Sequence, residues 1–191
     1  MRRFPGWPGR LSAVDDLTAL ALAAQAGDRT ALEQLVRRTQ ADVWRLSAHL
    51  VDRGSADDLT QDTFARAIAS LPRYRGEAPI KVWLLSITRR VCADAIRSTV
   101  RRRNLFARLP RPTAGEPAAT GHSELDSLVG DLDPDRRAAF VLTQVLGLSY
   151  QEAADVCGCP VGTIRSRVAR ARDDLTTAMR ADTAGDDVAE A

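Results

Sequence analysis

Several residue types are scarce in this sequence, and each scarcity excludes a class of protein. There are three cysteines, an odd number whose spacing fits no disulfide framework, and two histidines that could join them as metal ligands. These few residues favour neither a metal centre nor a redox centre, and Cys157 is expected to pack in a turn as a small apolar residue. The longest unbroken apolar run, residues 19–24, is far too short to span a bilayer, and the basic N-terminus lacks the apolar stretch of a signal peptide. We therefore predict a cytoplasmic protein without membrane insertion.

Motifs that carry chemistry are missing as well. The sequence has no phosphate-binding glycine loop, no plausible nucleophile triad and no paired metal-ligand motif. We therefore predict that the protein is not an enzyme and has no catalytic residues. We also expect it to need neither a metal nor another cofactor.

Aromatic residues make up only 5% of the chain, whereas alanine is abundant, and this composition favours helices over sheets. The net charge is only +2, but the charges are unevenly distributed. Residues 97–112 contain six arginines and no acid, whereas the last eleven residues contain four acids and no base. Local basic clustering of this kind suggests a polyanionic partner.

The most informative stretch is residues 148–172, which has the pattern of a helix-turn-helix. Ser149 and Glu152 have the spacing of a capping box, so a helix should begin directly after Ser149. This helix should stop at Gly158, which can adopt the left-handed conformation that a tight turn needs. Pro160 then suits the start of the second helix.

The second helix of this motif has one apolar face and one basic face. Ile164 and Val168 recur at helical spacing and should pack inward. Small residues on the opposite face let a helix enter a major groove deeply, and arginines fork onto guanine edges or clamp phosphates. The candidate DNA-contacting residues are Gly162, Thr163, Arg165, Ser166, Arg167 and Arg170. A merely solvated helix face is the alternative, and the coincidence of cap, turn and basic face argues against it.

The whole chain has the pattern of two helical units separated by a linker. Residues 1–14 are expected to form a disordered arm. Capping and turn signals predict helices that begin near residues 15, 28, 56 and 79, the last of which should reach about residue 98. Two further helices should precede the helix-turn-helix, and the acidic tail beyond Met179 should be disordered. The predicted fold is all-α, with a domain over residues 14–100, a flexible linker over 101–123 and a helix-turn-helix domain over 124–180.

The first domain has three candidate binding surfaces. Acids open its third helix at residues 57–62, although acids at a helix start also simply complement the helix dipole. The loop at residues 73–75 is Arg-Tyr-Arg, which suits an unpaired base and its phosphates but is a weak signal alone. The fourth helix carries small residues and arginines opposite its apolar stripe, and Trp83 lies on the stripe and is interpreted as a packing residue.

Two blocks of the sequence resemble the extracytoplasmic-function (ECF) sigma factors, the smallest promoter-specificity subunits of bacterial RNA polymerase. The first block comprises residues 56–64, 73–79 and 83–85, and the second comprises residues 148–154 and 158–167. Both blocks occur in the family's order at family-like spacing, and with the helices between them they cover roughly residues 14–180. One departure is Cys157, which stands where the family usually has a larger apolar residue, and this leaves a redox role of the turn open.

The resemblance implies partners and a role for each surface. The implied partners are the β′ and β subunits of core polymerase and promoter DNA, and whether an anti-sigma factor also binds is left open. The residues implied to dock on the β′ coiled-coil are Asp57, Asp58, Gln61, Asp62 and Phe64. The residues implied to hold and read the −10 element are Arg73, Tyr74, Arg75, Lys81, Ser86, Arg89, Arg90 and Arg97. The basic face of the helix-turn-helix would read the −35 element, and the linker would thread toward the polymerase active cleft.

Two rival interpretations remain at this stage. A stand-alone helix-turn-helix transcriptional regulator would share residues 148–172, but it would need an effector pocket or a dimerisation face and would have no use for the acidic patch. A partner-binding adaptor whose DNA helix is incidental is the second rival. The presence of two arginine-bearing helices argues against it.

Overall fold

The computed structural model describes residues 15–106 and 124–189, and every regular element within these ranges is helical. The N-terminal half contains α1 (Asp16–Gln25), α2 (Arg29–Leu50), α3 (Ala56–Ser70), the 3-10 turn η1 (Leu71–Arg73) and α4 (Ile80–Phe106). The C-terminal half contains α5 (Glu124–Asp131), α6 (Pro134–Phe140), the π-helical turn η2 (Val141–Val145), α7 (Tyr150–Cys157) and α8 (Val161–Ala189). The predicted all-α fold is confirmed. No helix of the described ranges is long and apolar enough to cross a membrane.

Side-chain caps explain where most of these helices begin. The Asp15 carboxylate accepts a hydrogen bond from the backbone N–H of Thr18 at 2.7 Å and starts α1. Asp28 and Asp133 cap α2 and α6 in the same way, because each satisfies backbone N–H groups that have no partner within the helix. Ser55 stands at the N-cap position of α3, but its side chain makes no hydrogen bond to that helix and donates instead to Asp52 at 3.0 Å.

One expected helix end is wrong. Helix α4 continues to Phe106 rather than ending near residue 98, so the first residues of the expected linker are helical, since no proline interrupts the chain before Pro110. The α-helical part of the sixth helix stops at Phe140, and the chain continues as a π-turn in which Leu146 N–H bonds to the Val141 carbonyl at 2.9 Å. The rest of the expected linker, residues 107–123, and the expected disordered arm, residues 1–14, lie outside the described residues.

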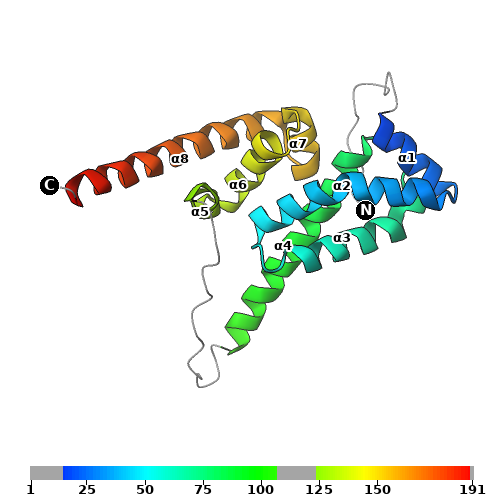
Figure 1. Ribbon diagram of the computed structural model, residues 1–191, viewed down its shortest axis with the longest axis horizontal. Helices are drawn as coiled ribbons and strands as arrows, with labels where there is room; N and C mark the ends of the chain where they lie inside the picture. Colours follow the sequence, from blue (N-terminus) through cyan, green and yellow to red (C-terminus); the bar gives the residue numbers. More distant parts are fainter. Residues whose placement is uncertain (1–14, 107–123, 190–191) are drawn as a thin grey trace.

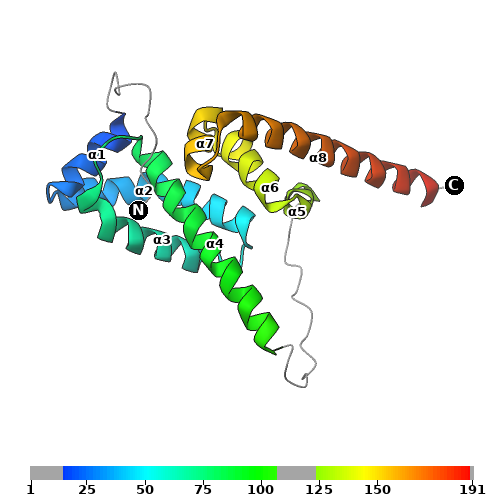
Figure 2. The ribbon, with the colours of Figure 1, turned by 180° about the vertical axis from the view of Figure 1, so that it is seen from behind.

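The acidic tail was expected to be disordered, and this prediction is wrong over most of its length. Helix α8 runs through the tail to Ala189, extending away from the rest of the molecule in both ribbon views (Figures 1 and 2). The tail has no proline and is rich in alanine, so propensity alone favours continuing the helix.

The N-terminal half packs α1, α2 and α3 around the first part of α4. Val43, Ala67 and Leu84 form one buried cluster between α2, α3 and α4. A second cluster joins α1 to the start of α4, where Ala21 and Ile80 are buried together. Helix α4 is therefore the central element of this half.

The two halves share a hydrophobic core. Leu46 of α2 and both Val82 and Leu85 of α4 are buried in one cluster with residues of α6, η2, α7 and α8. Helix α7 lies beside α4, as both ribbon views show (Figures 1 and 2). The sequence predicted two helical units but not this contact, which brings their surfaces together.

Candidate functional site

The helix-turn-helix is formed by α7 and α8. Ser149 accepts a hydrogen bond from the Glu152 N–H at 3.2 Å, and the Glu152 carboxylate accepts from the Ser149 N–H at 2.8 Å, which completes the predicted capping box. Gly158 ends α7 with φ = 67°, in the left-handed region that glycine adopts without strain. Ile164 is fully buried, so the register of α8 is fixed by its apolar side.

That register directs most of the predicted DNA-contacting residues outward. The exposed members are Gly162, Arg165, Ser166 and Arg170, and the Thr163 side chain is half-buried. Arg167 differs, because its guanidinium pairs with Asp135 of α6 and its Nη1 donates to the Cys159 sulfur at 3.7 Å. The exposed face is basic, and the small residues Gly162 and Ser166 lie among its arginines, which favours insertion into a groove.

The acidic surface at the start of α3 lies on the outside of the N-terminal half. Asp57, Asp58, Gln61 and Asp62 are all exposed, whereas Phe64 is half-buried and packs against Val43 and Leu84. The indole Nε1–H of Trp44 donates to the Asp57 carboxylate at 2.8 Å. This bond from α2 fixes the orientation of one acid of the surface, and sequence reasoning missed Trp44 because it lies in a different helix.

The loop between η1 and α4 differs from its sequence-based expectation. Arg73 and Arg75 are exposed, but Tyr74 is only 6% exposed, and its hydroxyl donates to the Ala78 carbonyl at 2.5 Å. Its ring packs against Trp83 with 5.3 Å between ring centroids. The expectation that Tyr74 is available to an unpaired base is therefore wrong for this structure, because the tyrosine holds the loop onto its own half.

The predicted −10 residues of α4, here called the basic strip, lie in two different environments. They are Lys81, Ser86, Arg89, Arg90 and Arg97. Arg90 and Arg97 are exposed, and Arg97 pairs with Asp94 at 2.5 Å. Hydrogen bonds from Arg66 and Arg97 hold the pKa of the Asp94 carboxyl below its usual value. This end of the strip points to solvent.

The other end of the strip faces the C-terminal half. Ser86 is only 4% exposed and its hydroxyl donates to the Val82 carbonyl at 2.8 Å, so the expectation of an exposed Ser86 is wrong here. The Lys81 ammonium bonds to Asp42 at 2.8 Å and to the Leu146 carbonyl at 3.2 Å. Arg89 lies 3.7 Å from Asp135. Sequence reasoning placed Ser86 and Arg89 on one helix face, opposite the apolar stripe, but had no signal for what covers that face.

The cysteines lie in apolar surroundings. Burial raises the pKa of Cys92 and of Cys157 to about 11, so at neutral pH both remain thiols, which are poor nucleophiles and poor metal ligands. No group of three potential metal ligands occurs within the described ranges. Cys157 sits at the end of α7, within the field of the Arg89 charge.

Comparison with known proteins identifies the family. The models for "Sigma-70 region 2" and "Sigma-70, region 4" match residues 35–102 and 122–175. The "ECF RNA polymerase sigma factor SigC" of Mycobacterium tuberculosis is 53% identical over 172 residues, which are 86% of this chain and 92% of that protein. This chain belongs to the ECF RNA polymerase sigma factors. It is accordingly a non-catalytic factor that directs transcription initiation, and the alternative of a stand-alone regulator is not needed.

More distant proteins share the sequence pattern and the fold. The sigma-E factor of Haemophilus influenzae is 32% identical over 171 residues, which are 81% of this chain and 90% of that protein. Among solved structures, CnrH in complex with the cytosolic domain of CnrY is 30% identical, with a TM-score of 0.68 over 86% of this chain and 97% of that chain. RpoE from Bartonella quintana, in complex with the anti-sigma factor NepR, is 29% identical with a TM-score of 0.66 over 79% of this chain and 98% of that chain.

Proposed function

We propose that this ECF sigma factor reads a promoter at two places while α3 anchors it to core RNA polymerase. In this proposal residues 14–100 bind core polymerase and the −10 element, and residues 124–180 bind the −35 element. The observation that carries it is the position of two basic surfaces on different halves of one chain, α4 in the first and α8 in the second.

The proposed −35 reader is the outward face of α8. Gly162 and Ser166 leave space for close approach, because a Cβ placed on Gly162 would meet nothing within 4 Å. Arg165 and Arg170 are exposed beside them and can donate to guanine edges or phosphates. The capping box and the left-handed turn hold this face at a fixed angle to α7.

The proposed −10 reader combines the exposed arginines of the loop at residues 73–75 with the basic strip of α4. Opening a promoter requires unstacking bases, which costs a few kcal/mol per base. Contacts from this strip to the phosphates and to the released bases would offset that cost, and such binding weakens steeply with salt. Lys81, Ser86 and Arg89 can take part only after the C-terminal half has moved off α4.

The proposed core-docking surface is the exposed acidic start of α3. Its four polar residues face solvent on a well-packed helix, and half-buried Phe64 lies one turn further along the same helix. Acidic side chains suit a basic partner surface and set orientation and encounter rate more than affinity. The β′ coiled-coil is the partner that the family implies, and a protein that works on core polymerase and promoter DNA is accordingly proposed to act in the cytoplasm. An anti-sigma factor, as crystallised with RpoE from Bartonella quintana, is a further candidate partner.

Two single substitutions separate the proposed roles. We expect Arg170→Ala to weaken promoter binding of the reconstituted holoenzyme about tenfold, as loss of one base or phosphate contact does, and to leave core binding unchanged. Asp58→Lys should weaken core binding, measured by fluorescence anisotropy with purified core polymerase. Arg38→Ala is the matched control, because Arg38 is an exposed arginine of α2 outside all proposed surfaces. Equal loss of core and promoter binding in Arg170→Ala would show that the residue is structural and would contradict the assignment.

A further inference from the structure

Four charged residues form a continuous series of ion pairs across the contact between α3 and α4, here called the ion chain. Arg66 of α3 pairs with Asp94 of α4, whose Oδ2 lies 2.9 Å from the Arg66 Nη1. The other oxygen of Asp94 accepts a hydrogen bond from Arg97 at 2.5 Å. The second terminal nitrogen of Arg66, Nη2, lies 3.8 Å from the Asp62 carboxylate. The sign of the charge therefore alternates along the ion chain, which begins at Asp62 and ends at Arg97.

The two ends of the ion chain belong to different proposed surfaces. Asp62 is one of the acids of the core-docking surface, and Arg97 is the outer end of the basic strip of α4. Their side chains are 64% and 66% exposed, so each can be reached by a partner molecule. Leu59 of α3 and Val91 of α4 are buried in one cluster, which holds the two helices against each other. The ion chain thus connects two binding surfaces across a well-packed contact.

Asp94 is the residue that the two arginines share. Hydrogen bonds from Arg66 and Arg97 hold the pKa of its carboxyl below the usual value, so the carboxylate is charged at neutral pH. One negative charge shared by two guanidinium groups binds each of them less strongly than it would bind either alone, because the two cations repel each other. A guanidinium that donates to a carboxylate also uses N–H groups that it would otherwise present to a phosphate.

We propose that Asp94 competes with promoter DNA for Arg97, and that Arg66 relays core docking at Asp62 to this competition. When a basic side chain of core polymerase pairs with Asp62, Arg66 pairs with Asp94 alone, and Arg97 is released to the DNA. This inference rests on the proposed function for the identity of the two partners, whereas the sharing of Asp94 is a property of the chain alone.

The strength of the ion pairs suits such a relay. All four side chains are about half exposed or more, and exposed pairs each shift an equilibrium by no more than about fivefold. A polymerase surface or a promoter offers several charges at once, so it outweighs pairs of this strength. The ion chain can therefore adjust DNA affinity by a small factor, and substitutions in it should leave the fold intact.

Neutralising Asp94 tests the competition in the free protein. We expect Asp94→Asn to raise the affinity for a labelled single-stranded oligonucleotide of mixed sequence about threefold, measured by fluorescence anisotropy at low salt. Asparagine keeps the size of the side chain but removes the charge that holds Arg97. In an Arg97→Gln background the gain should be lost, because the arginine to be released is absent.

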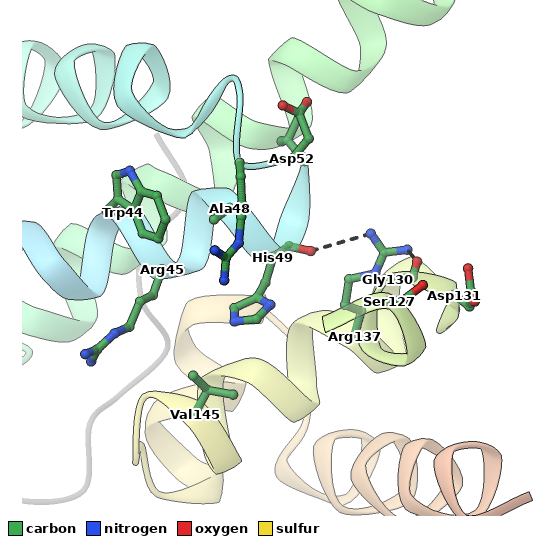
Figure 3. A pocket seen from close by; sticks show the side chains of 12 residues that line it. Trp44, Arg45, Ala48, His49, Asp52, Ser127, Gly130, Asp131, Arg137 and Val145 are labelled. Atoms are coloured by element: carbon green, nitrogen blue, oxygen red, sulfur yellow. Dashed lines mark hydrogen bonds between the residues drawn. The ribbon is translucent and has the colours of Figure 1, made fainter. Parts of the chain in front are cut away.

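Asp131→Asn is the matched control for the loss of one negative charge. Asp131 ends α5, and its charge acts on Arg137 of α6; both residues line the cavity between the end of α2 and these two helices (Figure 3). Arg137 belongs to no proposed DNA surface, and it donates to the carbonyls of His49 at 3.5 Å and Leu132 at 3.1 Å. The control should leave the oligonucleotide affinity unchanged. An equal rise in Asp131→Asn would mean that any lost negative charge acts in this way, and would contradict the proposal.

Arg66→Gln separates a shared charge from a general change of surface potential. Without Arg66, Asp94 should hold Arg97 more strongly, so the oligonucleotide affinity of the free protein should fall about twofold. In the Asp94→Asn background the same substitution should have no effect, because there is no charge left to share. If the two effects instead add in the double variant, the residues act only through the overall field, and the proposal is wrong. A rise in affinity for Arg66→Gln would also overturn it, since Arg66 would then help Asp94 to hold Arg97.

The last measurement includes core polymerase. The gain in oligonucleotide affinity when the holoenzyme assembles should be about twofold smaller in Arg66→Gln than in the wild type, because docking at Asp62 no longer releases Arg97. An equal gain in both proteins would overturn the relay. If instead the wild type directs no transcription with core polymerase, the proposed function fails, while the competition for Arg97 is still decided by the free protein.

Discussion

Tyr74 is buried, and both its ring and its hydroxyl have partners within the N-terminal half. Its hydroxyl donates to the Ala78 carbonyl at 2.5 Å in a buried site. Tyr74→Phe keeps the ring but leaves that carbonyl without its partner, so we expect the free energy of unfolding to fall by about 0.5–1.5 kcal/mol. Urea denaturation measures the change. Tyr150→Phe is the control, because Tyr150 is 37% exposed and should have no measurable effect.

The same residue predicts a pH dependence. Burial raises the pKa of Tyr74 above the ordinary value of 10.0. The neutral phenol is therefore favoured in the folded state, and its contribution to stability is complete below pH 10, where the unfolded chain keeps its proton as well. It declines as the pH rises from 10.0 toward the folded pKa. Stability measured across this range should fall less steeply in Tyr74→Phe than in the wild type, and identical slopes would contradict the assignment.

For single residues, the sequence predicted local backbone geometry better than burial. Gly158 and Ser149 were predicted correctly, because their geometry depends on neighbours within a few positions. Tyr74 and Ser86 were misplaced, because their burial depends on partners that the local pattern does not contain. Sequence reasoning assigned no role to Asp135, because nothing in the residues around it indicates the two arginines that it meets, Arg89 and Arg167.

The helix-turn-helix offers a test at the scale of an element. Gly158 has φ = 67°, and a Cβ there would meet nothing within 4 Å, so Gly158→Ala costs only the backbone strain of about 1–2 kcal/mol. Gly162 lies in the first turn of α8 with normal helical geometry and equally open space, so Gly162→Ala should leave stability unchanged or slightly raise it. Thermal unfolding of both variants measures the contrast.

The same pair separates folding from recognition. The added methyl of Gly162→Ala lies on the proposed groove-facing side of α8 and should reduce promoter affinity of the holoenzyme without loss of stability. Gly158→Ala should reduce affinity only to the extent that the domain unfolds. If Gly162→Ala is destabilising and Gly158→Ala is not, the register assigned to the motif is wrong.

The sequence predicted a helix correctly wherever an N-cap residue, an apolar stripe and a terminating turn occurred together, as they do at α2 and α7. Helix ends were less predictable where no breaker occurs. Helix α4 and helix α8 both extend past their expected ends, because arginine and alanine favour continuing a helix even where no apolar stripe requires it. The π-turn after Phe140 had no sequence signal, although the Thr143 hydroxyl bonds to the Ala139 carbonyl at 2.8 Å and competes there with the backbone.

The whole molecule is where sequence reasoning reached its limit. Amphipathic stripes indicate that a helix buries one side, and α4 has a second buried side that carries Ser86 and Arg89 beside Val82. A face that must be covered in one state and exposed in another needs a mixed composition. It therefore resembles a solvated face in the sequence, and only the three-dimensional contact reveals its partner.

Leu84 and Leu85 test this two-state arrangement, because they are consecutive residues of α4 that face different halves. Leu84 is 3% exposed and packs within the N-terminal half, whereas Leu85 is 1% exposed and packs in the core shared with the C-terminal half. Leu84→Ala should lower the free energy of unfolding by about 2–5 kcal/mol, as truncation of a buried leucine to alanine usually does. Leu85→Ala can lower the free energy of unfolding by no more than the free energy with which the two halves associate. The reason is that Leu85 is already exposed once the halves have separated.

The expected result is therefore an asymmetry between neighbouring leucines. Leu85→Ala should lower global stability by less than half as much as Leu84→Ala, yet it should increase the radius of gyration measured by small-angle X-ray scattering, since it shifts the population toward the open state. Leu84→Ala should leave the radius of the folded protein unchanged. Equal losses of stability with an unchanged radius in both variants would mean that the two halves unfold as one cooperative unit, and that α4 exposes its −10 face only when another molecule forces the halves apart.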